Sequence, residues 1–199
     1  PGAVLIGTQM IAKGLDFPDV TLVGVINADT MLKLPDFRAA ERTFDLLEQV
    51  AGRAGRGEKP GKVIIQSYWS THPAIASVVT HDRRPFLDAE LKERREGAYP
   101  PFSRLSNVLF WGVSEKEVRR VADQMAEALH TKLDAQTGWE ILGPADCVKA
   151  KVKDKYRRHI LVKSPVDAQV GEILSECAAS LDKRVGINMT LDVDAYDMM

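Results

Sequence analysis

Two arginines that each follow a glycine carry the clearest chemistry in this sequence. Arg53 and Arg56 lie three residues apart, and Gln49 precedes them in the pattern Gln-x-x-Gly-Arg-x-Gly-Arg. A guanidinium group is planar, always charged and able to bind two phosphate oxygens at once. Gly52 and Gly55 leave room for a ligand to approach the backbone. The pattern therefore predicts a site that brings positive charge to phosphate groups where charge develops during phosphoryl transfer.

The element that must position these arginines is an amphipathic helix over residues 37–52. Asp36 is suited to cap its start. Residues three apart on a helix share a face, so the two guanidinium groups are expected to point in the same direction. The alternative is a basic helix end that only complements the helix dipole. The apolar positions that recur at helical spacing are Phe44, Leu47, Val50 and Ala51.

A second candidate phosphate site is the loop that ends the apolar run at residues 3–8. That run favours a parallel strand buried on both faces. Residues 20–27 and 62–68 are expected to form two further strands, so that strands and helix alternate as in a parallel α/β sheet. A hydroxyl and free backbone N–H groups at a strand end can bind phosphate oxygens. Both candidate sites would then lie at the carboxyl ends of strands, where α/β sheets bind ligands.

Composition limits the class of protein. The chain has 199 residues, of which 45% are hydrophobic and 28% charged, as in an ordinary soluble protein of one or two domains. Its net charge of −1 means that any nucleic-acid-binding surface must be local. Cys147 and Cys177 are expected to be buried thiols, and no metal-ligand set is apparent. No apolar run is long enough to span a membrane. The first residue, Pro1, indicates a piece of a longer protein.

A proline-containing connector is expected to separate two domains. Residues 71–97 look helical and highly charged, and Pro85 suits the first turn of a helix. The following Tyr-Pro-Pro-Phe sequence, residues 99–102, bars helix and favours an extended connector. Tyr99 and Phe102 would pack against the next domain or stack on a base. We therefore divide the chain into domains at residues 1–97 and 98–199.

The second domain is expected to have the order β-α-β-β-α-β. This is the split βαβ, or ferredoxin-like, arrangement of an α+β domain. With both helices on one face, the other face of its antiparallel sheet would stay open. The expected strands are 103–112, 139–152, 157–163 and 187–195, with helices at 115–133 and from about 165.

A basic hairpin is the candidate binding feature of this domain. Alternating residues on a strand share a face, and a basic face with a tyrosine suits a surface that follows the phosphates of nucleic acid. The alternative, favoured equally, is a solvated hairpin tip that lysines keep soluble. Four lysines alternate here, Lys149, Lys151, Lys153 and Lys155, and Tyr156, Arg157, Arg158 and His159 follow.

The arginine pattern resembles motif VI of superfamily 2 helicases, and residues 7–18 resemble motif V. This resemblance implies that residues 1–97 are part of helicase lobe 2, which is RecA-like with a parallel sheet. It also implies that one arginine acts as a finger toward ATP on the opposite lobe, and that the threonine loop touches nucleic acid. The implied residues are Gln49, Arg53 and Arg56 for catalysis; Gly14, Asp16 and Gly52 for ATP; and Thr8, Gln9 and Lys13 for nucleic acid.

Two sequence patterns of such helicases are missing here. The chain has no Gly-x-x-x-x-Gly-Lys-Ser/Thr loop and no Asp-Glu dipeptide. In the family these belong to the other lobe, which would hold most of the ATP and its Mg²⁺. The chain alone is therefore not expected to hydrolyse ATP.

Across its length the chain resembles the bacterial replication-restart helicases. This implies a monomeric, cytoplasmic and nucleoid-associated 3′-to-5′ DNA helicase that recognises stalled or abandoned forks and assembles the primosome. Forked and single-stranded DNA, single-strand-binding protein and other primosome proteins would be partners, and Zn²⁺ would bind an upstream insertion. The alternatives are a different superfamily 2 repair helicase, or a module that only binds DNA or protein. The further residues that carry the resemblance are 36–38, 41–42, 99–102, 142–144 and 191–194.

Overall fold

The computed structural model describes residues 3–8, 20–54, 60–182, 186–196 and 198. The chain forms two compact units, Pro1–Lys92 and Glu93–Met199. The boundary expected from the sequence, after residue 97, falls within the second of these. Each unit has its own sheet, and the fold as a whole is mixed α and β. No helix among the described residues is long and apolar enough to cross a bilayer.

The first unit contains a parallel pair of strands. β1, Leu22–Val25, pairs with β2, Lys62–Ile65, so that Leu22 lies opposite Lys62 and Val25 opposite Ile65. This confirms the parallel arrangement expected for these two segments. The prediction that these strands are buried on both faces is wrong, because their residues alternate between exposed and half-buried. A two-stranded sheet with helices on one side leaves its other side in solvent.

The apolar run at residues 3–8 is not a strand. It has no regular secondary structure, and the side chains of Val4 and Ile6 are each 88% exposed. The prediction fails because a strand needs a neighbour to pair its backbone N–H and C=O groups. Among the described residues, β1 and β2 pair only with each other. The apolar composition of this segment was therefore not sufficient to make it a strand.

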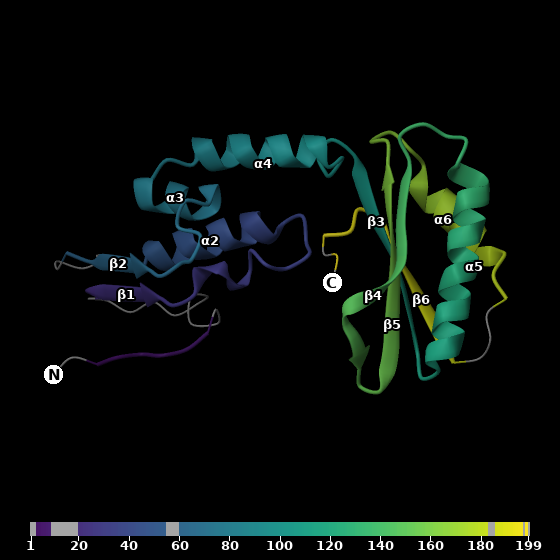
Figure 1. Cartoon of the computed structure of the whole chain (residues 1–199), viewed down its shortest axis with the longest axis horizontal. Helices are drawn as coiled ribbons and strands as arrows, with labels where there is room; N and C mark the ends of the chain where they lie inside the picture. The colour runs from purple at the N-terminus through teal and green to yellow at the C-terminus, as the bar shows by residue number, and fades with distance from the viewer. Residues whose placement is uncertain (1–2, 9–19, 55–59, 183–185, 197, 199) are drawn as a thin grey trace. The chain divides into compact units, whose positions relative to one another are not determined.

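In the described part of the chain, three helical segments lie within the first unit, and a fourth begins there and ends just beyond its boundary (Figure 1). They are η1 (Ala28–Thr30), α2 (Ala39–Ala51), α3 (Pro73–Thr80) and α4 (Arg84–Glu96). The predicted arginine-bearing helix is confirmed as α2, and Pro85 lies in the first turn of α4. Phe44 and Leu47 of α2 are buried, and the Phe44 ring stacks on Phe86 with centroids 4.5 Å apart. The predicted apolar face of α2 therefore holds α3 and α4 against it.

Charged residues fix the start of α2. The side chain of Asp36 is fully buried, and its Oδ1 accepts a hydrogen bond from the Arg38 backbone N–H at 2.8 Å. Arg42 Nη1 lies 3.2 Å from Asp36 Oδ2, and Arg38 pairs with Glu41. The carboxylate of Asp36 therefore anchors the segment before the helix, but the prediction that Asp36 caps the helix is wrong, because α2 begins at Ala39 and its N-cap is Arg38, with no side-chain cap bond.

The second unit is a four-stranded antiparallel sheet with two helices. Its strands follow the spatial order β4-β5-β3-β6, and neighbouring strands are antiparallel throughout. The elements follow the order β-α-β-β-α-β along the chain. They are β3 (Arg104–Gly112), α5 (Glu115–Leu133), β4 (Glu140–Val152), β5 (Lys155–Ser164), α6 (Val170–Ala179) and β6 (Ile187–Asp192).

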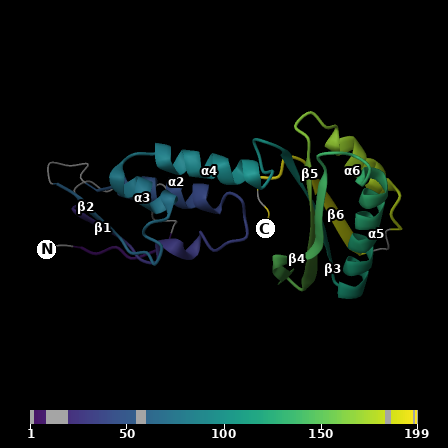
Figure 2. The same cartoon turned by 45° about the horizontal axis from the view of Figure 1, so that its top comes forward.

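Both helices lie on the same side of this sheet (Figures 1 and 2). Ser114 caps α5 by accepting a hydrogen bond from the Glu117 N–H at 3.4 Å. The predicted apolar stripe of α5 is confirmed as a row of buried side chains that meets Val108, Phe110 and Ile160 of the sheet. Neither α5 nor α6 packs on the other face of the sheet. That stripe is Val118, Val121, Ala122, Met125, Leu129 and Leu133.

The connector at residues 99–102 is a turn and not an extended segment. The Phe102 N–H donates to the Tyr99 carbonyl at 3.0 Å, which folds the chain back on itself. Lys163 of β5 is 6% exposed, and its Nζ lies 4.2 Å from the centroid of the Tyr99 ring. The same Nζ donates to the Gly97 carbonyl at 2.7 Å. Of the two roles considered for Tyr99, the structure shows packing against its own unit.

Candidate functional site

The end of α2 carries the predicted catalytic residues. Gln49 is exposed in the last turns of the helix, and Gly52 is its C-cap. Arg53 follows the helix in a turn, where its N–H donates to the Val50 carbonyl at 3.1 Å. Arg56 lies outside the described residues. The prediction that both arginines share a helix face is therefore wrong for Arg53, because α2 ends at Ala51 and Arg53 lies beyond its C-cap.

The loop resembling motif V is described only at its start. Thr8 is exposed and belongs to no strand. Gln9, Lys13, Gly14 and Asp16 lie outside the described residues. The described geometry therefore does not bring this loop and the arginine run together, and their shared site stays a prediction.

Asp29 is a residue that the sequence interpretation missed. It lies in η1, just after β1, and it is fully buried. Its carboxylate accepts hydrogen bonds from Ser67 Oγ at 2.6 Å, from the Tyr68 N–H at 2.8 Å and from the Trp69 N–H at 3.2 Å. The Ser67 hydroxyl is the main cause of a lowered pKa of Asp29, and it outweighs burial, which acts the other way. This carboxylate joins the carboxyl ends of the two parallel strands.

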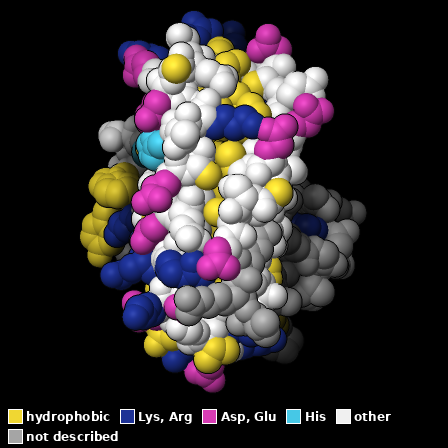
Figure 3. Space-filling view, turned by 90° about the vertical axis from the view of Figure 1, so that its right-hand side faces the viewer, with side chains coloured by type: hydrophobic (Ala, Val, Ile, Leu, Met, Phe, Trp, Pro, Cys, Tyr) yellow, Lys and Arg dark blue, Asp and Glu magenta, His cyan; other side chains and the backbone are white. Residues whose placement is uncertain are grey.

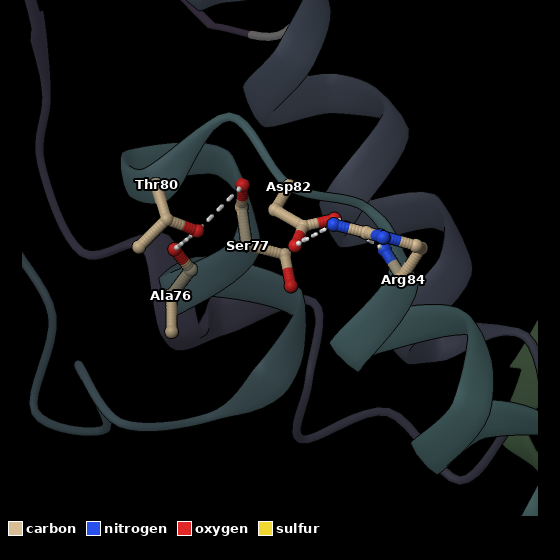
Figure 4. A network of polar contacts seen from close by, with 5 residues as sticks. All are labelled: Ala76, Ser77, Thr80, Asp82 and Arg84. Carbon is tan, nitrogen blue, oxygen red and sulfur yellow. Dashed lines mark hydrogen bonds and ion pairs between the residues drawn. The ribbon is translucent and has the colours of Figure 1, made fainter.

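Other charged groups of the first unit satisfy one another. Arg83 reaches α2 with its Nε 2.9 Å from Glu48 Oε1. Arg84 holds Asp82 with two bonds of 3.0 Å, and this pairing lowers the pKa of the Asp82 carboxyl (Figure 4). Figure 4 also shows Thr80 donating to the Ala76 carbonyl at 3.1 Å at the end of α3. Both arginines therefore organise the segment between α3 and α4.

The basic hairpin predicted in the second unit is present. Lys153 and Asp154 form its turn with φ of 47° and 58°, the left-handed region that two-residue hairpin turns need. Lys151 lies opposite Tyr156, and Val152 opposite Lys155. The prediction that four lysines share a face is wrong, because the turn intervenes. Lys155 faces the side of the sheet opposite to Lys151 and Tyr156.

Two basic residues of this hairpin have partners within the chain. Lys151 Nζ lies 5.0 Å from the centroid of the Tyr156 ring and 3.4 Å from Asp154 Oδ1. Arg158 Nη1 lies 3.1 Å from Asp146 Oδ1, and its Nη2 donates to the Pro144 carbonyl at 2.8 Å. These contacts stabilise the hairpin. Within the described part of the chain, Lys149, Lys153, Lys155 and Arg157 form no ion pair.

The helix-free face of the second sheet brings together residues from three strands. Arg157 of β5 lies directly opposite Trp111 of β3, and Trp111 lies directly opposite Asn188 of β6. One step along the strands, His159 lies opposite Leu109. Burial and the nearby charges of Arg157 and Arg158 lower the pKa of His159, with burial the larger cause. Both effects favour the neutral form of the imidazole.

The sequence interpretation did not single out Trp111, although strand alternation contained the signal. Val108 and Phe110 face the helices, so Leu109 and Trp111 must face away from them. Using that signal required knowing which side the helices cover. Among the described residues, the structure contains no group of three His, Cys, Asp or Glu side chains placed to hold a metal ion.

Comparison with known proteins identifies the class of the second unit. The family model described as Primosomal protein N C-terminal domain matches residues 95–196. The match spans the antiparallel sheet and both of its helices. The unit is therefore a C-terminal domain of the primosomal protein N type.

The relatives extend the similarity over the first unit. The Replication restart protein PriA of Bacillus subtilis (strain 168) is 44% identical over 202 residues, which cover 98% of this chain and 24% of that protein. The PriA protein of Treponema pallidum (strain Nichols) is 42% identical, covering 98% of this chain and 30% of that protein. This chain thus spans about a quarter of the length of these relatives. The chain belongs to the PriA family.

Proposed function

We propose that this chain is part of an ATP-dependent 3′-to-5′ DNA helicase that acts in replication restart. In this role it recognises stalled or abandoned forks and helps to assemble the primosome. The observation that carries the proposal is membership of the PriA family along nearly the whole chain. The Gln-x-x-Gly-Arg-x-Gly-Arg run at the end of α2 supports the helicase assignment.

The finer fold assignments belong to the same proposal. The first unit is part of a RecA-like helicase lobe, which the parallel pair β1 and β2 with α2 supports. The second unit is ferredoxin-like, which its element order and its strand order β4-β5-β3-β6 support. In this scheme the first unit contributes to ATP hydrolysis, and the second unit contributes to binding.

At the ATP site, Arg53 or Arg56 is the finger, and Gln49 positions water or the other arginine. Gly14, Asp16 and Gly52 lie near the nucleotide. ATP and Mg²⁺ are held mainly by residues of a different lobe, because this chain has neither a phosphate loop nor an Asp-Glu pair. The 199-residue chain alone therefore has no ATPase activity.

The second unit binds DNA in this proposal. Lys153, Lys155 and Arg157 support it, because each of these cations lacks an acidic partner in the described structure. Forked and single-stranded DNA are the ligands, and single-strand-binding protein and other primosome proteins are the partners. A cytoplasmic, nucleoid-associated location and an upstream zinc site belong to the whole protein.

A module that binds only protein is the second candidate function. The two are distinguished by fluorescence-anisotropy titration of the 199-residue chain against forked, duplex and single-stranded DNA at two salt concentrations. We expect binding that weakens with salt and that the paired change Lys155→Ala and Arg157→Ala weakens further. A chain that binds none of the three DNAs would favour the protein-binding module.

A further inference from the structure

The helix-free face of the second sheet has an uneven distribution of charge. At one end, Lys163 pairs with Glu140, with Lys163 Nζ 2.9 Å from Glu140 Oε2. Asp192 lies opposite Asn107 in the adjoining register position. Beyond it, the face presents His159, Arg157 and Lys155 on β5. Along this second half, the described strand residues on the face include no acidic side chain.

Trp111 lies in the middle of this cationic half. Arg157 and Asn188 flank it on the neighbouring strands, and the indole is half-buried. An indole beside an arginine on an otherwise flat sheet offers a surface on which a planar aromatic ring can stack. Neither Trp111 nor Arg157 belongs to the apolar core on the helix side. The core therefore does not explain why they lie there.

Two polar atoms on the same face have no partner. Within the described part of the chain, His159 Nδ1 and Asn107 Oδ1 are buried and receive or donate no hydrogen bond. Buried polar atoms are usually paired, because an unmet hydrogen bond costs free energy. These two residues lie on neighbouring strands, one register step apart. Because both atoms are shielded from solvent, a ligand on this face would meet the side chains around Trp111 and would not reach these two atoms.

We propose that this face binds single-stranded DNA, with one base stacked on Trp111 and the adjoining phosphates bound by Arg157 and Lys155. This inference deepens the proposed DNA binding of the second unit and rests on it. A duplex presents its bases stacked and paired, so its base faces are closed to an indole. An unpaired base exposes its face, and every base has one, so stacking here is independent of sequence.

The opposite side of the unit has a different character. Figure 3 shows acidic and basic side chains interspersed over the helix side. There Arg119 Nη2 lies 3.8 Å from Glu115 Oε1, and Lys132 forms an ion pair with Glu176. Arg119 therefore provides a matched control for Arg157, since both are arginines of the same unit and only Arg157 lies on the proposed surface.

The test compares five forms of the 199-residue chain, namely wild type, Trp111→Leu, Trp111→Phe, Arg157→Ala and Arg119→Ala. Each is titrated with oligo-dT of about 15 nucleotides, with an abasic strand of equal length and with a duplex. We expect Trp111→Leu to weaken oligo-dT binding roughly 5- to 100-fold, which is the range for one lost stacking contact. Trp111→Phe should retain most of the affinity, and Arg119→Ala should match the wild type.

The abasic strand separates stacking from damage to the fold. It retains phosphates and lacks bases, so Trp111→Leu should bind it as the wild type does. Arg157→Ala should weaken binding of both oligo-dT and the abasic strand, and it should lower the salt slope of binding by about 0.7. Equal oligo-dT affinity of the wild type and Trp111→Leu, or equal losses for both strands, would overturn the stacking role.

These outcomes also separate the inference from the function on which it rests. If the Trp111→Leu variant binds DNA with full affinity, the proposed DNA-binding function stands and only the proposed binding surface is rejected. If the wild-type chain binds neither the oligo-dT, the abasic strand nor the duplex, both the function and the surface are rejected. A face that serves a protein partner would leave all DNA affinities unchanged in every variant, which also rejects the proposal.

Discussion

The carboxylate of Asp29 and the hydroxyl of Ser67 lie 2.6 Å apart, although 38 residues separate them. Asp29 follows β1, and Ser67 follows β2. Their hydrogen bond therefore joins two parallel strands just beyond their paired segments. The backbone N–H groups of Tyr68 and Trp69 donate to the same carboxylate. The geometry where these two strands end therefore depends on one buried acidic group.

Replacing Asp29 should destabilise the first unit. Asp29→Ala leaves the Ser67 hydroxyl and two N–H groups without their acceptor, and Asp29→Asn removes only the charge. Because the folded-state pKa of Asp29 is lowered, its contribution is present above the unfolded value of 3.8 and is lost as the pH falls through the folded value. Urea unfolding of each variant at pH 7 and pH 3 measures this. We expect the wild-type and Asp29→Ala midpoints to converge at the lower pH, and a constant gap would contradict the assignment.

The arginine finger can be tested in the complete helicase that we propose. Arg56→Ala, or Arg53→Ala if that residue is the finger, should reduce ATP turnover by roughly a thousandfold or more. DNA affinity should change little, because the finger acts on the transferred phosphoryl group. A coupled ATPase assay with DNA-binding titrations measures both, and Arg119→Ala is the control. Full turnover in both single variants would exclude these arginines from catalysis.

His159 should make the second unit less stable in mild acid. Its folded-state pKa is lowered from 6.5, so the unfolded chain binds the proton more readily. The contribution of His159 to the free energy of unfolding is therefore fully present above pH 6.5, and it decreases as the pH falls from 6.5 toward the folded-state pKa. Urea midpoints at pH 7.5 and 5.5 should therefore differ more for the wild type than for His159→Gln. An NMR titration of the His159 ring that gives a midpoint above 6.5 would refute this.

Asp194 should anchor the end of β6 to β3. Its Oδ1 accepts from Arg104 Nε at 2.7 Å, and this pairing lowers the pKa of the Asp194 carboxyl. Asp194→Asn should lower the urea midpoint at pH 7, and the difference from wild type should shrink as the pH falls below 3.8. Asp192→Asn is the matched control, because Asp192 is exposed and the same chemical change breaks no ion pair there. Equal effects of both changes would remove the anchoring role.

The core of the second unit should depend strongly on α5. Leu129 is fully buried between the helix and the sheet, so Leu129→Ala should cost about 2–5 kcal/mol of unfolding free energy. Leu91 on α4 is 44% exposed, and the same substitution there should change stability by less than about 0.5 kcal/mol. Urea unfolding followed by circular dichroism compares the two. Similar costs would contradict the assignment of Leu129 to the core.

Long periodic segments of this fold could be predicted from the sequence. Glu115–Leu133 was expected as a helix with those bounds, because its apolar stripe spans five turns and Ser114 marks the start. Residues 3–8 were not predictable, since an apolar run specifies burial without specifying a pairing partner. The position of Arg53 depended on where α2 ends, and helix ends are poorly specified by pattern.

The candidate site was harder to predict for a related reason. The contact between Asp29 and Ser67 joins residues that no local pattern connects. The four lysines of the hairpin were placed on one face by their alternating spacing, although a turn was expected near Lys153, Asp154 and Lys155, where the structure has it. Trp111 was overlooked because its face depends on which side the helices cover, and that is decided by the path of the whole chain.

The division of this sheet into two faces affects how the domain can evolve. Trp111, Arg157 and Asn188 lie outside the core that Val108, Phe110 and α5 form on the other face. Substitutions at these three positions therefore alter little of what holds the domain together. Related proteins can therefore differ in the ligand that this face binds while they keep the same stable fold.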